Sequence, residues 1–178
     1  MNSSIDSDSE NVREAGGKKP DVGFLFADYS HFLALGFGSG LAPRAPGTVG
    51  TIAAIPLWLL LATQSFLTQI ALIAIAFLFG IYLCRKTADA LDVHDHGAIV
   101  WDEFVGLWLT LALLPAGWLW IVGGFLLFRF FDIVKPWPIA YLDRHIDGGM
   151  GIMIDDVVAA VFAATTMWLL IYLWSLLF

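Results

Sequence analysis

Acidic and basic residues that could bind a metal ion and a phosphate group occur in three short segments of the chain. Carboxylate oxygens are the ligands that hard cations such as Mg²⁺ prefer, while arginine and lysine bind phosphate oxygens. Carboxylates, magnesium and a cationic clamp are the usual components of a phosphoryl-transfer site. The three segments contain Asp102 and Glu103; Arg129, Asp132 and Lys135; and Asp155 and Asp156.

The spacing within these segments limits which side chains can share a cavity. Residues three apart on a helix lie on one face, so the arginine and aspartate of the second segment can point the same way. Adjacent residues lie about 100° apart around a helix, so both members of an acidic pair cannot point inward equally. We expect Glu103 and Asp156 to point inward. Asp102 and Asp155 would then lie nearer helix caps, a purely structural role that acids at helix starts often have.

A Gly/Pro-rich loop, GFGSGLAPRAPGTVG, occupies residues 36–50 and leads directly into an apolar run. Backbone N–H groups at a helix N-terminus, with a threonine hydroxyl beside them, can bind an anion. We therefore expect Gly47, Thr48 and Gly50 to contact a phosphate. The loop lacks the lysine and the preceding strand of a nucleotide-binding loop. Close packing of helices in a membrane would explain its glycines equally well.

The segment LDVHDHG contains His94, Asp95 and His96, which could ligate a metal ion or relay a proton. A polar turn held by its own side-chain hydrogen bonds is an equally good interpretation. The single cysteine, Cys84, excludes an internal disulfide and a cysteine-based metal site.

The composition of the chain is that of a membrane protein. Hydrophobic residues make up 59% of the 178 positions, charged residues only 14%, and the mean hydropathy is +0.79. The formal net charge of -7 excludes nucleic acid as a partner, because neutralising phosphates needs a basic surface. The length fits one compact unit. The few charged residues are therefore the informative ones.

Uncharged runs predict an all-α, polytopic membrane bundle of about five membrane-embedded helices, with the Gly/Pro-rich loop before the first. A helix needs about 20 residues to cross the hydrocarbon core, and some of these are short enough to require tilt or partial insertion. Polar residues after position 62 and Pro115-Ala116-Gly117 mark the turns. The expected helices are a first one containing Pro56, then Thr68–Cys84, Ile99–Leu114, Gly117–Val134 and Val157–Phe178.

The topology of these helices places the charged residues on one side of the membrane. With the N-terminus inside, the outer turns and the C-terminal end carry no charge, so the positive-inside rule makes the charged side cytoplasmic. The two ends of the expected hairpin and the start of the last helix then meet at the cytoplasmic edge. Residues 1–30 are polar and acidic, which predicts a disordered tail before a membrane-embedded domain over 31–178.

Four long blocks of the sequence resemble bacterial phosphatidylglycerophosphatase A, in the same order and spacing, with similarity over roughly residues 31–175. The resemblance implies a multi-pass inner-membrane phosphatase with its active site facing the cytoplasm. Such an enzyme uses Mg²⁺ to hydrolyse the lipid phosphatidylglycerophosphate to phosphatidylglycerol and inorganic phosphate, upstream of cardiolipin. The blocks are GFGSGLAPRAPGTVGT (36–51), VHDHGAIVWDEFVG (93–106), FRFFDIVKPWPI (128–139) and DGGMGIMIDDVVA (147–159).

The resemblance puts the functional blocks on the residues already singled out, and makes 31–178 the phosphatase domain. Our mechanistic hypothesis is direct attack by a metal-activated water, with a covalent aspartyl-phosphate as the rival. Glu103, Asp132 and Asp156 would hold Mg²⁺. Arg129, Lys135 and the loop containing Thr48 would neutralise the phosphate oxygens. Asp102 or Asp155 would orient the water as general base or complete a two-metal site.

Other chemistries and functions fit the sequence less well. No C-x5-R thiolate motif surrounds the cysteine, and the D-x-D-x-[TV] motif and the CDP-lipid phosphotransferase motif are absent. The alternative of a different class is a small membrane transporter or channel subunit that uses clustered acids for cations. That function would place the charges deep in the span, whereas here they lie at one edge. The sequence gives no oligomeric state.

Overall fold

A computed structural model describes residues 18–93 and 95–177, and the predictions for residues 1–17, His94 and Phe178 lie outside it. The described residues form helices and no strand, which confirms the all-α class. The elements are α2 (Val22–Ala27), α3 (Tyr29–Ala34), the 3₁₀ segment η1 (Gly36–Leu41), α4 (Pro46–Leu61), α5 (Phe66–Leu91), α6 (Trp101–Ala112), α7 (Trp118–Val134), α8 (Ile139–His145) and α9 (Gly148–Leu177).

The five predicted helices all occur, as α4, α5, α6, α7 and α9, with different ends. Helix α5 begins earlier than expected because the Ser65 side chain accepts a hydrogen bond from the Thr68 N–H and caps it. Helix α9 begins at Gly148 instead of Val157. Charged residues had served as the boundary in the prediction, but a helix continues through acids that its neighbours bury.

Length and composition allow only two of the described helices, α5 and α9, to cross a membrane. This is fewer than the five membrane-embedded helices that the sequence predicted. Helix α4 is apolar but shorter, and the 12 residues of α6 rise only about 18 Å, against about 30 Å of hydrocarbon. The turn around Pro115 and Gly117 ends α6 before it is long enough to span.

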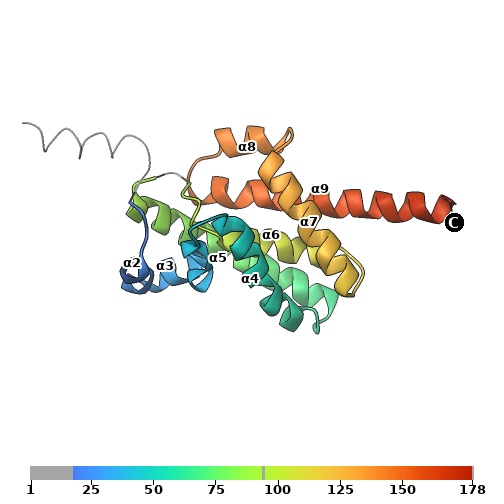
Figure 1. The fold of residues 1–178 in the computed structure, drawn as a ribbon, viewed down its shortest axis with the longest axis horizontal. Helices are drawn as coiled ribbons and strands as arrows, with labels where there is room; N and C mark the ends of the chain where they lie inside the picture. Colours follow the sequence, from blue (N-terminus) through green and yellow to red (C-terminus); the bar gives the residue numbers. More distant parts are fainter. Residues whose placement is uncertain (1–17, 94, 178) are drawn as a thin grey trace, which may run out of the picture.

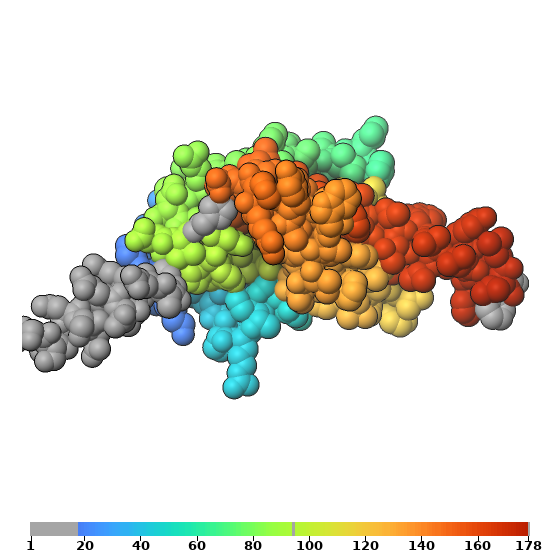
Figure 2. Space-filling view, turned by 90° about the horizontal axis from the view of Figure 1, so that it is seen from above, coloured from blue at the N-terminus to red at the C-terminus, as the bar shows by residue number. Residues whose placement is uncertain are grey.

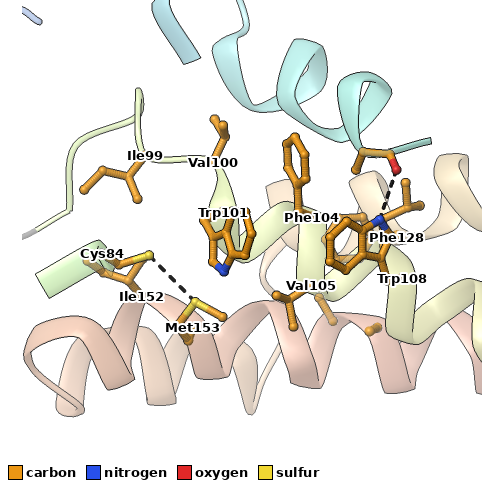
Figure 3. Packing of buried hydrophobic residues seen from close by; sticks show 14 of the residues in the cluster. Cys84, Ile99, Val100, Trp101, Phe104, Val105, Trp108, Phe128, Ile152 and Met153 are labelled. Atoms are coloured by element: carbon orange, nitrogen blue, oxygen red, sulfur yellow. Dashed lines mark hydrogen bonds between the residues drawn. The ribbon is translucent and has the colours of Figure 1, made fainter. Parts of the chain in front are cut away.

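Helix α9 is the centre of the bundle (Figure 1). Helices α5, α6, α7 and α8 all pack on it, while α4 packs on α6 and α3 on α5. The core between them is rich in aromatic side chains, and the Trp108 indole N–H donates to the Ala54 carbonyl of α4 at 3.0 Å (Figure 3). Cys84 is buried against the sulfur of Met153 at 3.7 Å, as a small packing residue.

The part of the predicted tail that the structure describes is helical from Val22 onward. Asp21 and Asp28 cap α2 and α3 by accepting backbone N–H hydrogen bonds. Asp28 also pairs with Lys86 of α5 at 2.7 Å, and the Lys86 hydrogen bond holds the pKa of Asp28 below its usual range. The two short helices are therefore attached to the bundle, because acids that looked like tail residues act as caps and partners.

Candidate active site

An arginine bridge joins the two ends of the predicted hairpin. The Arg129 guanidinium, on the last turns of α7, donates to Glu103 Oε1 on the first turn of α6 at 3.1 Å. The same nitrogen donates to the Asp132 carboxylate, one helical turn away. The three side chains are only 11–13% exposed. The predicted common face of Arg129 and Asp132 is thus occupied by an ion pair, which also includes Glu103.

A lysine bridge lies next to it, at the end of α7. Lys135 adopts a left-handed backbone conformation (φ 44°) that ends the helix. Its ammonium donates to Asp155 Oδ2 on α9 at 2.6 Å and to Asp143 Oδ1 on α8 at 2.7 Å. Burial alone would lower the pKa of Lys135, but the two carboxylates outweigh it and raise that pKa above its usual range.

Asp143 was not among the predicted site residues. From the sequence we expected it in a loop before the last helix, because α8 is only seven residues long. The signal that could have found it is a carboxylate eight positions after Lys135, beyond a Pro-Trp-Pro turn that folds the chain back. It accepts a hydrogen bond from the same ammonium group as Asp155.

Asp155 and Asp156 are both buried, at 5% and 2% exposure. The expectation that Asp155 lies near a cap is wrong, because α9 begins at Gly148 and both acids lie well inside it. They point in different directions: Asp155 meets Lys135, whereas the Cβ of Asp156 lies 3.2 Å from where a side chain on Gly106 of α6 would begin. Since α9 is covered by helices on several sides, two adjacent acids can both be interior.

Several buried oxygens in this cluster have no hydrogen-bond partner. Asp156 forms neither a hydrogen bond nor an ion pair with any described residue, and Asp102 is half-buried at the start of α6. Leaving a buried carboxylate oxygen unpaired is costly, so such groups are suited to binding a cation or a proton. The unpartnered atoms are Asp102 Oδ1, Glu103 Oε2, Asp155 Oδ1 and Asp156 Oδ2, together with the Arg129 Nε donor.

These oxygens fit a hard divalent cation in their chemistry. Within the described ranges, however, no group of three His, Cys, Asp or Glu side chains is arranged to hold a metal ion. Arg129 and Lys135 each neutralise carboxylates that would otherwise be free to converge. The donor atoms are of the type that a hard divalent cation prefers, while the side chains as they stand are arranged around Arg129 and Lys135.

The Gly-rich loop reaches the acidic cluster at Gly47. A Cβ on Gly47 would lie 2.0 Å from Glu103 Oε1 and 3.0 Å from an Arg129 guanidinium nitrogen, so α4 begins directly against the arginine bridge. Thr48 follows it, half-buried. Gly50 is different, because a Cβ there would meet the Val100 side chain at 2.6 Å, and its role in the structure is close packing.

The histidine segment contributes Asp95, whose charge acts on Asp102 and Glu103. His96 Nδ1 accepts a hydrogen bond from the Ala98 N–H at 3.1 Å, which is the local turn interpretation. His94 is outside the described residues. The structure thus brings together the predicted acids, Arg129, Lys135 and Gly47, and gives packing or turn roles to Gly50 and His96.

Comparisons with known proteins identify the family of the chain. The family model for phosphatidylglycerophosphatase A matches residues 32–171. Phosphatidylglycerophosphatase A of Escherichia coli is 49% identical over 147 residues, 82% of this chain and 86% of that protein. The Haemophilus influenzae protein of the same name is 52% identical over 151 residues, 82% of this chain and 90% of that protein.

A more distant relative carries a different name. A Bacteroides thetaiotaomicron protein, named as a candidate phosphatidylinositol-3-phosphatase, is 37% identical over 139 residues, 74% of this chain and 86% of that protein. A search of solved structures finds no match. The family match covers most of the chain, including both bridges and Gly47, and confirms the resemblance seen in the four sequence blocks: the chain is a member of the phosphatidylglycerophosphatase A family of phosphatases.

Proposed function

We propose that this protein hydrolyses the phosphomonoester of phosphatidylglycerophosphate, producing phosphatidylglycerol and inorganic phosphate, with Mg²⁺ as cofactor. The observation that carries the proposal is the buried arginine bridge, with unpartnered carboxylate oxygens around it and Gly47 against it. The names of the two bacterial relatives supply the substrate. The phosphomonoester is shared with other lipid phosphates, so the rest of the lipid must be recognised elsewhere.

Glu103, Asp132 and Asp156 are the residues that would hold magnesium. The unpartnered oxygens of Glu103 and Asp156 support this assignment. Asp132 would become available as a ligand if Arg129 left their ion pair to bind the phosphate. Bound there, the ion would stabilise negative charge on the phosphate and lower the pKa of a water ligand. Asp102 and Asp155 each retain an unpartnered oxygen that could complete the coordination or act as a base.

Arg129 and Lys135 would bind the phosphate oxygens. Both now lie between carboxylates, and Arg129 has a buried Nε donor with no partner, which a phosphate oxygen would satisfy. The N–H groups at the start of α4 and the Thr48 hydroxyl add uncharged donors. Because Gly47 has no side chain, a phosphate can approach the backbone here as closely as Glu103 does.

The hydrolysis itself then needs one base. The oxygen of a water attacks phosphorus, the bond to the glycerol oxygen breaks, and that oxygen takes up a proton. Asp102 or Asp155 would accept the proton of the attacking water, since both lie beside the proposed metal ligands in the sequence and have a buried oxygen free to do so. Arg129 would neutralise the charge that develops on the transferring group.

The site would face the cytoplasm from the inner membrane, with the helices embedded to different depths. Helices α5 and α9 support a membrane location, and the uncharged turns at the opposite end of the bundle support the orientation. Helices α4, α6 and α7 would then be inserted only partly, since α6 is too short to cross. A lipid would present its headgroup to the acids from the same leaflet.

Phosphate release from lipid substrates tests the proposed function. The purified protein in detergent should release inorganic phosphate from phosphatidylglycerophosphate with Mg²⁺, and EDTA should stop the release until excess Mg²⁺ is added. Phosphatidylinositol 3-phosphate and phosphatidic acid, at equal concentrations, serve as competing lipid phosphates. Phosphate release from phosphatidylinositol 3-phosphate alone would instead favour the activity for which the Bacteroides relative is named. No release from any of the three would favour the cation-transport alternative, which cation uptake into vesicles measures.

Replacing Gly47 by alanine should reduce phosphate release about a hundredfold, because a displacement of about 1 Å in a catalytic group has effects of that size. The new Cβ would push Glu103 Oε1 away from 2.0 Å and move the carboxylate off Arg129. Gly97→Ala is the matched control, since a Cβ there meets nothing within 4 Å. Equal activities of the two variants would remove Gly47 from the site.

A further inference from the structure

A cavity of about 320 Å³ lies at the end of the bundle away from the acidic site. Its walls come from the end of α4, the α6–α7 turn and the start of α7. They are mostly apolar and include Trp58, Trp118 and Trp120. A cavity of this size and composition is typical of a binding site for an apolar ligand, and the proposed chemistry makes no use of it.

Helices α4, α6 and α7 each contribute residues to both the acidic site and the cavity. Along α6, eight residues separate Glu103 from Leu111, a rise of about 12 Å. Along α4, eleven residues separate Gly47 from Trp58, a rise of about 17 Å. One leaflet of a bilayer contributes about half of the 30 Å hydrocarbon core. The cavity is therefore about one acyl-chain length from the place where a phosphate headgroup would bind.

Helix α9 gives an independent measure of the distance between the acidic site and the cavity. The Trp168 indole N–H donates to the Leu113 carbonyl at the α6–α7 turn at 2.8 Å, which fixes the level of the turn. From Asp156 to Trp168 α9 rises about 18 Å, and from there to Leu177 about 14 Å more. The C-terminal part of α9 extends beyond the other helices, as Figures 1 and 2 show. With the acids at the cytoplasmic edge, the turn and its cavity lie near the bilayer midplane.

The neighbouring α4–α5 turn has the hydrogen bonding expected at such a depth. Its polar side chains are all paired within the turn: Thr63 with the Leu60 carbonyl, Gln64 with Thr63, Ser65 with Thr68, and Gln69 with the Gln64 carbonyl. In hydrocarbon, polar groups must be satisfied by the protein itself. Gln69 is also part of the cavity wall.

The lipid-facing route between site and cavity runs beside α6. Helices α4 and α7 both pack on α6 and are not main packing partners of each other. Their outer surfaces are apolar and exposed, with Ile52 on α4 and Leu126 and Phe130 on α7. An acyl chain attached to a headgroup at Arg129 would lie along this surface.

A second apolar groove, of about 400 Å³, lies among α5, α6 and α9 and is the other candidate binding site for an acyl chain. It includes Val105 and Leu109 of α6. Val105 lies about 200° around the helix from Glu103, so the groove is on the far side of α6 from the arginine bridge. A chain attached to the headgroup would have to pass around the α6–α9 contact to reach it.

We propose that the cavity at the α6–α7 turn binds the end of an acyl chain of the lipid whose phosphate occupies the acidic site. This inference rests on the proposed function for the class of headgroup, a phosphomonoester. The cavity would make the protein prefer membrane-borne phosphomonoesters over water-soluble ones carrying the same headgroup. Binding of the chain end near the midplane would also hold the headgroup at the level of Arg129.

Photo-crosslinking locates the chain end without relying on catalysis. A phosphatidylglycerophosphate analogue with a diazirine at the end of one acyl chain is bound to the protein in lipid nanodiscs, irradiated, and mapped by mass spectrometry. We expect labelled peptides from the cavity wall, at residues 58–62 and 111–121, and competition by unlabelled phosphatidylglycerophosphate but not by phosphatidylcholine. Labelling confined to the α5–α6–α9 groove would overturn the proposal.

Filling the cavity tests its contribution. Ala112→Phe should reduce the crosslink and raise the KM for diacyl substrate about tenfold, the size of effect that apolar pocket contacts have. The deacylated headgroup should be turned over unchanged. Ala71→Phe, on an exposed face of α5 outside both apolar sites, is the matched control. If Ala112→Phe lowers the melting temperature, Ala62→Phe at the open side of the cavity replaces it in the comparison.

The outcomes separate this inference from the proposed function. A crosslink in the cavity without phosphate release from any lipid would keep the acyl-chain site and reject the phosphatase activity. Phosphate release with a KM that both cavity variants leave unchanged would keep the activity and reject the site. Equal losses on the diacyl and deacylated substrates would also reject it, because such losses report on the acidic site.

Discussion

Replacing Asp156 by asparagine should abolish phosphate release and at the same time raise the thermal stability of the protein. The carboxylate is 2% exposed, one of its oxygens has no partner, and no cation of the described chain pairs with it. An uncompensated buried charge destabilises a fold by several kcal/mol, and a neutral amide of the same shape relieves much of that. A gain of about 1 kcal/mol corresponds to about 2–4 °C in Tm for a chain of this size.

Thermal unfolding and phosphate release, measured on the same preparation, check this prediction. Asp89→Asn is the matched control, because Asp89 is an exposed acid on α5 whose ion pair with Arg85 is long, at 3.9 Å. That variant should leave both quantities unchanged. Mg²⁺ should raise the Tm of the parent protein and have little effect on Asp156→Asn. A less stable but active variant would show that Asp156 is a structural residue.

Replacing Arg129 by methionine should have the opposite effect on stability and the same effect on activity. The change removes the cation shared by Glu103 and Asp132 and leaves two mostly buried carboxylates unpaired. Breaking a buried ion pair from one side costs about 3–5 kcal/mol. It also removes the guanidinium proposed to neutralise the phosphate, and single contributions of that kind are worth about 10²–10³ in kcat.

A double variant separates the two effects. Adding Glu103→Gln to Arg129→Met removes one of the two stranded charges and should recover part of the lost stability. Activity should not return, since neither the guanidinium nor the carboxylate is present. Recovered activity in the double variant would mean that the arginine bridge is a structural ion pair beside the site. Denaturant unfolding and phosphate release under identical detergent conditions give both answers.

The charge balance of the site connects these two predictions. Six acids converge with two cations: Asp102, Glu103, Asp132, Asp143, Asp155 and Asp156 with Arg129 and Lys135. The excess of negative charge is unfavourable in a buried setting, and a divalent cation would offset it. The same excess of negative charge that destabilises the fold would thus favour binding of the divalent cation that the proposed reaction needs.

The sequence by itself located the charged residues of the candidate site and the helices that carry them. Uncharged runs and proline or glycine breaks located all five long helices, because hydrophobic composition is a local property. The hairpin interpretation put residues 102–103 beside residues 129–135, since two helices joined by a tight turn bring their far ends together. The Arg129–Glu103 contact has that origin.

Local patterns could not determine how each helix is rotated about its axis or where it ends. Asp155 was expected near a cap, yet α9 begins at Gly148 and Lys135 pairs with it across 20 residues. Asp143 joined the site because α8 folds back over α9. Gly47 and Gly50, three residues apart, looked equivalent, but one abuts Glu103 and the other Val100.

The lengths of the helices were likewise decided by the tertiary structure. The uncharged runs predicted five membrane-embedded helices, some of them tilted or partly inserted, whereas only α5 and α9 are long and apolar enough to cross. The position of the α6–α7 turn beside Trp168, and of the cavity there, follows from how α6 and α7 pack on α9. Residue types and short-range spacing fix the chemistry available to the chain. The contacts between distant side chains depend on packing, which no short window of sequence contains.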